Sequence, residues 1–543
     1  MKSKKSAPRP GVIFHPDLLA GFNLIAEAVK PTLGPLARKV GVEANMPNRT
    51  PEMLDDAGTI ARRILQFADP GLDAGAMLLR HALWRMREQC GDGSATLAVI
   101  AQAMLRQAAQ AVAAGAHPAL LRRGIELGVA RATQLLRAVT EQIPPGVGRR
   151  ALLASLAGSL CSDETLRDVL VEVVDILGPD GAIHVENAND LRVERDFVEG
   201  ALWDSPWLAG GFATETGNLM GRVEDAAVVL MDGSLDNPAN VCEGLGRLHG
   251  MGVKHVVLLA SDLSDDARAV LLQARQAALF TILPIKTPGL GGARVVGLQD
   301  LATLTGARIL FGDSAGFAGI ASGDLGEARR AWVTARQFGI IGGRRDPLAL
   351  RARIRAARQR LEVATEPDEL AELRLRAGRL QGGLAVVRVG AVTARHQQAR
   401  KEEAIRLASA LQMAARRGVV PGGGAALFHI GVALRAAATG HSDEAWGMRC
   451  VAIGLEAPLA AIVANAGFDA AAIAGLLRSG RASQRGRGFD VRQGRIVDMR
   501  ATGILDSAET VERAIRVAGS VVGMAVTTDA LVLRRAPPTA SHP

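Results

Sequence analysis

The sequence predicts a multi-domain protein of mixed α+β and α/β class, in which both ends of the chain build a mostly helical domain. Three observations lead to this fold class. Both ends have an Ala- and Gly-rich helical pattern, whereas short β-rich runs alternate with helices in mid-chain. The chain has 543 residues, enough for about three or four domains with cores of their own. The middle of the chain is therefore expected to be an insertion into the helical domain.

The N-terminal part, residues 14–140, is predicted to be mostly helical. Between residues 18 and 29, apolar residues recur at intervals of three and four, which is typical of a helix with one buried face. This helix should end before Pro31, because a proline disfavours helical backbone at the preceding residue. Two longer helices are expected over 94–114 and 117–140, and the chain is again helical from residue 399 onward.

The middle part has a different pattern. Three short β-rich runs, Ala227–Met231, His255–Ala260 and Phe280–Ile285, alternate with helical patterns at 238–249 and 264–277. Strands that alternate with helices build βαβ units, in which the helices cover a sheet. A separate α/β domain is therefore expected in mid-chain.

A charged helical hairpin is expected over residues 347–380. Apolar residues line one face of each helix, and the break Thr365-Glu366-Pro367-Asp368 supplies a turn and a helix start. The many arginines of this hairpin could form a polyanion site. A solvated amphipathic hairpin explains the same pattern, and we favour that interpretation.

Composition and charge narrow the class of protein. The net charge of +9 favours acidic partners, but with no Tyr, 12 Phe and 5 Trp the chain lacks the aromatic side chains of a nucleic-acid platform. No uncharged apolar run reaches the ~18 residues of a transmembrane helix, and no apolar segment follows the basic start. Neither a membrane nor nucleic acid is therefore expected as a partner. A cytoplasmic location is expected, because the four cysteines are far apart and lack metal-ligand spacing. They are Cys90, Cys161, Cys242 and Cys450.

Four turns of small residues could carry chemistry. Glycines that open a helix let backbone N–H groups approach a phosphate, and the helix N-terminus adds positive potential there. Asp92 stands between two glycines, where its carboxylate could hold a divalent metal beside the phosphates. Each turn alone is weak evidence for a nucleotide site. The turns are Thr32-Leu33-Gly34-Pro35, Gly91-Asp92-Gly93-Ser94-Ala95-Thr96, Gly422-Gly423-Gly424 and Gly503-Ile504-Leu505-Asp506.

In combination the motifs are far more specific. They are TLGP at 32–35, GDGSAT at 91–96, SDET at 162–165, LQDLATLTG at 298–306, GVVPGGGAAL at 418–427 and GILD at 503–506. In this fixed order they resemble the group I chaperonins of the bacterial GroEL type, the 60 kDa chaperonins, with this chain as a divergent member. The likeness runs from about residue 14 to about residue 535 without large gaps.

The resemblance implies three domains and a ring assembly. An equatorial ATP-binding domain would comprise residues 1–138 and 414–543, and an intermediate hinge domain 139–198 and 383–413. An apical domain, 199–382, would bind clients and a co-chaperonin. Family members form two stacked seven-membered rings that enclose unfolded polypeptide under a small co-chaperonin lid. ATP with Mg²⁺, and with K⁺ as the resemblance suggests, would drive the change from capture to encapsulation. The activity implied is a chaperonin ATPase of the isomerase class.

The resemblance also assigns roles in the nucleotide site. Asp92 would bind Mg²⁺, and Asp56 and Glu403 would order the attacking water, because attack on a γ-phosphate needs positioning and charge neutralisation. The nucleotide contacts would come from Thr32, Leu33, Gly34, Pro35, Asp92, Gly93, Ser94, Ala95, Thr96, Gly423, Asp490, Val491 and Asp506.

Several positions depart from the family's pattern. Glu403 stands where the family has its main catalytic Asp, and a small misplacement of such a group can cost about a hundredfold in rate. Asp55 stands where the family has a Lys, which removes a positive charge near the phosphates. The stretch Asp490-Val491-Arg492 replaces Asn-Ala-Ala. Slow hydrolysis is therefore expected.

The resemblance also places the client-binding groove of the family. Four of its positions are large apolar residues here, and two polar residues, Arg268 and Gln273, interrupt them. The full set of positions is Trp207, Gly211, Phe212, Cys242, Leu245, Arg268, Leu272 and Gln273, of which Trp207, Phe212, Leu245 and Leu272 would bind clients. Exposed apolar side chains there would bind the apolar groups of an unfolded client. Helix packing in a core explains the same residues equally well, and both interpretations stay open.

Two functions from different classes follow. We favour an ATP-driven chaperonin that captures and encapsulates non-native polypeptides. The alternative is a chaperonin-derived binding or scaffold protein with weak or lost ATPase. This would explain Glu403, Asp55 and the polar groove residues Arg268 and Gln273. A metabolic kinase fits poorly, because no acceptor-substrate site emerges from the sequence.

Overall fold

The computed structural model describes residues 16–43, 51–144, 148–188, 190–214, 220–312, 314–344, 346–364, 367–381, 383–479 and 486–529. The chain divides into two compact units, Met1–Asp175 with Glu402–Pro543 (unit 1) and Ile176–Lys401 (unit 2). Both ends of the chain therefore contribute to one unit, and the middle of the chain forms the other. The finer division into three domains stays a prediction.

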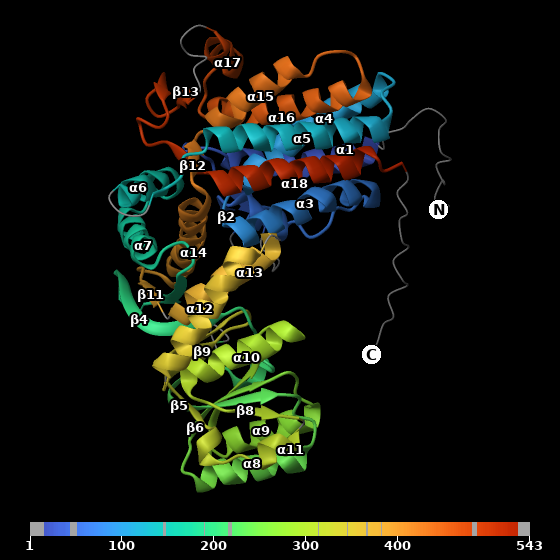
Figure 1. Cartoon of the computed structure of the whole chain (residues 1–543). Helices are drawn as coiled ribbons and strands as arrows, with labels where there is room; N and C mark the ends of the chain where they lie inside the picture. Colours follow the sequence, from blue (N-terminus) through green and yellow to red (C-terminus); the bar gives the residue numbers. More distant parts are fainter. Residues whose placement is uncertain are drawn as a thin grey trace, which may run out of the picture. The chain divides into compact units, whose positions relative to one another are not determined.

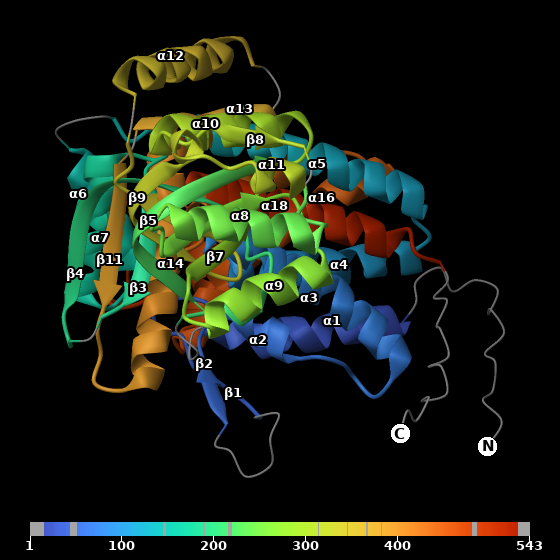
Figure 2. The same ribbon diagram turned by 90° about the horizontal axis from the view of Figure 1, so that it is seen from below.

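Unit 1 is built around long helices that pack side by side (Figures 1 and 2). Their apolar faces meet in one core that includes Phe22, Leu83, Ile100, Leu455 and Val522. The expected helix over residues 18–29 ends at Val29, before Pro31. The long helices are α1 (Pro16–Val29), α3 (Pro70–Cys90), α4 (Ser94–Ala113), α5 (Pro118–Val139), α16 (Asp443–Asn465) and α18 (Ala508–Val526).

Glycines let α5 and α16 approach each other closely. A β-carbon at Gly124 of α5 would lie 2.2 Å from the carbonyl O of Glu444, and one at Gly447 of α16 would lie 2.3 Å from that of Leu121. These distances are shorter than any van der Waals contact, so a larger residue at either position would push the helices apart.

Helix α16 is, by length and composition alone, apolar enough to cross a membrane, with a mean hydropathy of 1.6 over its most apolar window. That window is 67% buried inside the protein. Val451, Leu455 and Leu459 are among its buried side chains. Packing in the core therefore accounts for its apolar composition.

Shorter elements complete unit 1 and position its loops. Strand β12 pairs with β15 so that Val420 lies opposite Asp506, and β13 pairs with β14. The helices are α2 (Ala57–Arg63), α6 (Arg149–Leu160), α7 (Glu164–Leu177), α14 (Ala394–Arg417), α15 (Ala425–Ala437) and α17 (Ala470–Arg478), of which α7 and α14 continue into unit 2. The strands are β1 (Val40–Val42), β2 (Glu52–Leu54), β12 (Val419–Pro421), β13 (Arg487–Asp490), β14 (Arg495–Asp498) and β15 (Leu505–Ser507), and η1 (Lys30–Thr32) is a short 3₁₀-helix.

Unit 2 contains a mixed sheet whose strands follow the order β3-β11-β4-β10-β9-β5-β6-β7, with β8 paired to β5. The pairs β5–β6 and β6–β7 are parallel, as expected for βαβ units. The expected strand His255–Ala260 is β6, and the two other expected strands lie within or overlap β5 and β7. The strands are β3 (Ala182–Asn187), β4 (Val193–Trp203), β5 (Gly221–Asp232), β6 (His255–Ala260), β7 (Thr281–Lys286), β8 (Ile309–Phe311), β9 (Gly326–Val333), β10 (Phe338–Ile341) and β11 (Gly383–Val389).

Helices cover both faces of this sheet. Successive residues of β5 alternate between two cores: Val228 and Leu230 pack with α10 (Gly292–Thr305), whereas Val229 and Met231 pack with α8 (Pro238–Gly250) and α9 (Asp265–Gln276). Side chains of a strand point to opposite faces in turn, so the two cores lie on opposite faces of the sheet. Figure 1 shows α10 on one side of β8, and α8 and α9 on the other. The α/β architecture expected in mid-chain is confirmed.

The expected charged hairpin consists of α12 (Pro347–Val363) and α13 (Pro367–Gln381). Residues 365 and 366 of the expected turn lie outside the described residues. Ala357, Leu373, Ala377 and Leu380 are buried. Most of the described arginines of α12 are exposed, which agrees with an amphipathic hairpin.

His184 on β3 is a buried histidine whose charge should affect stability. Burial, together with the nearby charges of Lys401 and Arg222, lowers its pKa to about 3. Its Nε2 atom lies 4.0 Å from Glu186, too far for a hydrogen bond, and its ring lies 4.5 Å from that of Trp332. The folded protein therefore holds this histidine neutral, whereas an unfolded chain protonates it below its usual pKa of about 6.5.

We expect the stability of unit 2 to fall as the pH is lowered from about 6.5 toward 3, because the unfolded state binds the extra proton. His184→Phe keeps a ring against Trp332 and removes the loss of stability that protonation of His184 causes in the unfolded chain. Relative to wild type, the variant should gain about 2 kcal/mol between pH 7 and pH 4.5. Urea denaturation at the two pH values, followed by hydrogen exchange of the unit 2 strands, measures this difference. An equal loss of stability in both proteins would contradict the prediction.

Candidate nucleotide site

The GDGSAT motif forms the link between α3 and α4 in unit 1. Gly91 ends α3 with φ +70° and Gly93 begins α4 with φ +86°, both in the left-handed region that side chains rarely adopt. A β-carbon at Gly93 would also lie 2.6 Å from the methyl group of Thr510. Asp92 therefore stands in a tight turn immediately before the N-terminus of a long helix, where backbone N–H groups and the helix dipole favour an anion.

Asp92 is accessible to solvent although protein atoms surround it closely. Its side chain is exposed to solvent. The surrounding protein nevertheless raises its pKa, chiefly by removing solvation, and the negative charge of Asp56 adds to this effect. The N–H of Gly93 and the charge of Arg406 act in the opposite direction. A carboxylate that solvent reaches but does not fully solvate is suited to hold a cation.

Asp506 brings a distant part of the chain to the same place. It lies on β15, and loss of solvation raises its pKa to about 7, with a further increase from the charge of Asp92. A hydrogen bond from the N–H of Gly423 opposes this rise. The motifs GDGSAT, GGG and GILD therefore converge, as the resemblance implied. The β12–β15 pairing joins GGG and GILD, with Gly422 N 2.9 Å from the carbonyl O of Ile504. The close approach of Gly93 to Thr510 brings GDGSAT to the start of α18 (Ala508–Val526), directly after β15.

The TLGP loop and the stretch around Asp490 contribute to one apolar cluster of unit 1. Leu33 and Val491 belong to one apolar cluster with Val99 of α4 and Leu459 of α16. Asn465, which the sequence analysis did not single out, holds the loop: its side chain donates to the carbonyl oxygens of Lys30 and Leu33, both at 2.9 Å.

Several residues that are predicted to contact the nucleotide use their side chains in hydrogen bonds to the protein backbone. Thr32 donates to the carbonyl O of Val29 at 2.7 Å, and Ser94 donates to that of Leu83 at 3.0 Å. Asp490 accepts from the backbone of Arg492 at 2.9 Å within its own turn. Thr32, Ser94 and Asp490 therefore offer their backbone, more than their side chains, to a ligand.

Asp56, one of the two expected catalytic carboxylates, caps α2. Its Oδ2 accepts from the backbone N–H of Thr59 at 2.8 Å and from Nε of Arg87 at 2.6 Å. The side chains of Asp56 and Arg87 are only 14% and 17% exposed. This carboxylate is thus held firmly by a cation and a helix N-terminus.

Glu403, the other expected catalytic residue, is directed elsewhere. Its carboxylate lies near the thiol of Cys161, and burial together with this neighbour raises the pKa of Cys161 to about 12. Its neighbour Glu402 has a carboxylate oxygen 3.6 Å from Nη2 of Arg87. In this structure, therefore, the α14 carboxylate beside Asp56 is Glu402 and not Glu403. A shift of one residue turns a helical side chain by about 100°, which sequence spacing did not resolve.

The carboxylates present suit magnesium that is held largely by phosphate. No group of three or more His, Cys, Asp and Glu side chains with metal-binding geometry occurs in the described parts of the chain. Mg²⁺ usually takes one or two protein carboxylates and completes its octahedron with phosphate oxygens and water. Asp92 fits this role, because its carboxylate is exposed beside the helix N-terminus.

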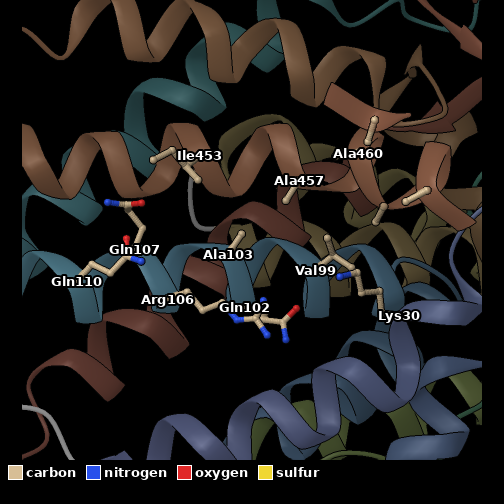
Figure 3. Close-up of a pocket in the computed structure, with 13 residues that line it drawn as sticks. Lys30, Val99, Gln102, Ala103, Arg106, Gln107, Gln110, Ile453, Ala457 and Ala460 are labelled. Atoms are coloured by element: carbon tan, nitrogen blue, oxygen red, sulfur yellow. The ribbon is translucent and has the colours of Figure 1, made fainter. Parts of the chain in front are cut away.

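A separate cavity of about 450 Å³ lies between α4 and α16 (Figure 3). Alanines line much of it, and neither Asp92 nor Asp506 does. Two of its polar side chains already have partners: Gln102 donates to Glu27 at 3.0 Å, and Arg106 forms an ion pair with Glu27 at 3.0 Å. This cavity is therefore not the expected nucleotide site.

The four expected client-binding residues of unit 2 are buried or partly buried. Phe212 is 0% and Leu245 7% exposed, and both pack in the core beneath α8 and α9. Trp207 and Leu272 are partly buried against the same core. For Phe212 and Leu245 the structure favours the alternative of helix packing over an open client surface.

Comparisons with known proteins agree with this fold. The model of the TCP-1/cpn60 chaperonin family matches residues 25–536. The chain therefore belongs to the TCP-1/cpn60 chaperonin family.

Two solved structures show a similar fold. One is the chaperonin gp146 from bacteriophage EL 2 (Pseudomonas aeruginosa) in the presence of ATP-BeFx, with 17% identity, a TM-score of 0.70, and coverage of 96% of this chain and 98% of the other. A second crystal form of the same chaperonin gives 18% identity and a TM-score of 0.67, with the same coverage. At these identities the likeness is one of fold.

Proposed function

We propose that this protein is an ATP-driven chaperonin of the group I type, which captures non-native polypeptides and encloses them in a ring cavity. The observation that carries the proposal is that the GDGSAT turn lies against the chain that follows GILD at the start of α4. A β-carbon on Gly93 would lie 2.6 Å from the methyl group of Thr510, and the charge of Asp92 acts on Asp506. A helix N-terminus, two glycine turns and adjacent carboxylates suit a triphosphate with its magnesium ion.

Individual residues of this chain would have the following roles in the site. The backbone of residues 93–96 would bind phosphate oxygens, and Asp92 would hold Mg²⁺, which neutralises phosphate charge when bound. Asp56 is held by Arg87 and Thr59, so it would orient water through its remaining lone pairs. Asp506 and the backbone of Gly423 would contact the nucleoside. K⁺ as a second ion, seven-membered rings, a co-chaperonin lid and a cytoplasmic location remain parts of this proposal.

The alternative, a chaperonin-derived scaffold with weak or lost ATPase, also has support. Glu403 lies near Cys161, and Phe212 and Leu245 are buried rather than open to clients. Both observations are compatible with a protein that binds nucleotide without a productive cycle.

One set of measurements on the full chain separates the two functions. A working chaperonin should hydrolyse ATP in the presence but not the absence of Mg²⁺, form rings in negative-stain images, and raise the yield of a chemically denatured client. Ring formation and ATP binding without turnover or client refolding would favour the scaffold. The absence of Mg²⁺-dependent ATP binding would contradict both.

A further inference from the structure

One face of α14 touches the loop that carries Asp92. Glu402, Arg406 and Ser409 share this face, because they are spaced by four and three residues. A β-carbon on Gly91 would lie 2.7 Å from the carbonyl O of Arg406 and 3.1 Å from Cβ of Ser409. The backbone of α14 therefore lies directly against the turn of the candidate nucleotide site.

Arg406 is the cation on this face. Its side chain is partly buried. No hydrogen bond or ion pair engages its guanidinium group among the residues that the structure describes. Its charge is close enough to Asp92 to act on that carboxylate. An arginine that is half-buried beside an exposed carboxylate, without a fixed hydrogen bond or ion pair, can bind a ligand oxygen there.

The neighbouring arginine of the site, Arg87, is already engaged. Its Nε atom donates to Asp56 at 2.6 Å, its Nη2 lies 3.6 Å from Glu402, and its guanidinium lies 5.2 Å from the ring centre of Trp84. Its stem packs against Gly58, where a β-carbon would lie 2.6 Å from Cβ of Arg87. Arg87 is thus fixed as a partner of the carboxylates, and Arg406 is left for a ligand.

We propose that Arg406 binds the terminal phosphate of the nucleotide, as a cation that α14 supplies to the site from the same chain. This inference rests on the proposed function and adds a residue to it. A guanidinium group presents two parallel N–H donors that match phosphate oxygens. Asp55 stands where the resembling family has a positive charge, and Arg406 would supply a positive charge from another element.

The chemical role of Arg406 is charge stabilisation. In hydrolysis, a water oxygen forms a bond to the γ-phosphorus while the bond from that phosphorus to the β–γ bridging oxygen breaks. The electron pair of the broken bond leaves with ADP, and the water proton passes to the released phosphate or to solvent. Arg406 keeps all its protons and neutralises charge on the γ-phosphate oxygens throughout the reaction.

Binding of two nucleotides tests this role in the full-length protein. Arg406→Ala should weaken the affinity for ATPγS with Mg²⁺ at least about tenfold, because hydrogen bonds to charged groups are lost. The affinity for ADP with Mg²⁺, which lacks the terminal phosphate, should change less than about twofold if Arg406 contacts that phosphate alone. The single-turnover rate of ATP hydrolysis should fall about a hundredfold or more.

Two further variants make the result specific. Arg406→Lys keeps the charge but not the paired donors, so it should recover part of the ATPγS affinity. Arg417→Ala removes an exposed arginine from the end of the same helix and should match wild type. Circular dichroism and thermal unfolding check that the variants are folded.

The outcomes separate this inference from the proposed function. If wild type binds both nucleotides and Arg406→Ala weakens ATPγS and ADP equally, or weakens neither, Arg406 does not bind the terminal phosphate. If wild type binds neither nucleotide, the proposed function itself fails and the inference fails with it.

Discussion

Asp92→Ala should abolish Mg²⁺-dependent ATP hydrolysis, with a loss of at least about a hundredfold in kcat. Asp92 is the exposed carboxylate at the N-terminus of α4, so its removal takes away the protein's contact with the metal ion. The assay is phosphate release from purified full-length protein with and without Mg²⁺. Equal background rates in wild type and Asp92→Ala would show that the site does not hydrolyse ATP.

Stability measurements should show that the Asp92 variants lose ATP hydrolysis without losing their folded structure. Because the surrounding protein raises the pKa of Asp92, the charged carboxylate is disfavoured in the folded protein without a ligand. Asp92→Asn should therefore unfold at the same temperature as wild type or at a higher one, although it too is inactive. Glu126→Gln, an exposed change on α5, serves as the matched control and should keep full activity. A large drop in the unfolding temperature of Asp92→Asn would point to a structural role.

Asp300→Asn should destabilise unit 2 by about 3–5 kcal/mol, because it removes one partner of a buried group of charges. Asp300 on α10 is 5% exposed. Its carboxylate accepts from Nε of Arg353 on α12 at 2.6 Å and from Nε of Arg376 on α13 at 2.7 Å. The carboxylate of Asp300 therefore joins both helices of the charged hairpin to α10. Without its charge, the partly buried guanidinium groups of Arg353 and Arg376 have no anionic partner there.

Hydrogen exchange of the β5, β6 and β7 amides measures this effect within unit 2. The matched control is Glu369→Gln, which breaks the ion pair between Glu369 on α13 and Arg360 on α12. The side chain of Glu369 is 44% exposed and that of Arg360 is 60% exposed. Such a surface pair contributes less than about 1 kcal/mol. Equal protection in Asp300→Asn and Glu369→Gln would show that Asp300 does not anchor the hairpin.

Local patterns predicted much of the fold. The run His255–Ala260 is β6, and the expected helices 94–114 and 117–140 correspond to α4 and α5 within one or two residues. These elements have strong periodicity and clear ends, such as Pro118 at the start of α5. The strands β4, β9, β10 and β11 were not predicted. Strand β4 pairs with β10 and β11, and β9 pairs with β5, each across a long stretch of chain, and no local pattern records such pairing.

The candidate site was predicted from the combined motifs, not from any one of them. The convergence of Asp92 and Asp506 depends on the close approach of the Gly93 turn to Thr510 at the start of α18, which the sequence alone did not show. The directions of single side chains on α14 were beyond sequence reasoning for a different reason. The phase of a helix relative to its neighbours is set by packing, so the placement of Glu402 beside Arg87, and of Glu403 beside Cys161, required the structure.

The most direct test of the account is an experimental structure of the full-length protein with magnesium and a non-hydrolysable ATP analogue. It should show the metal ion on the Asp92 carboxylate, the triphosphate at the N-terminus of α4, and Asp506 near the nucleoside. A nucleotide bound elsewhere, without contact to Asp92 or Asp506, would contradict the claim that these distant segments form one ATP site.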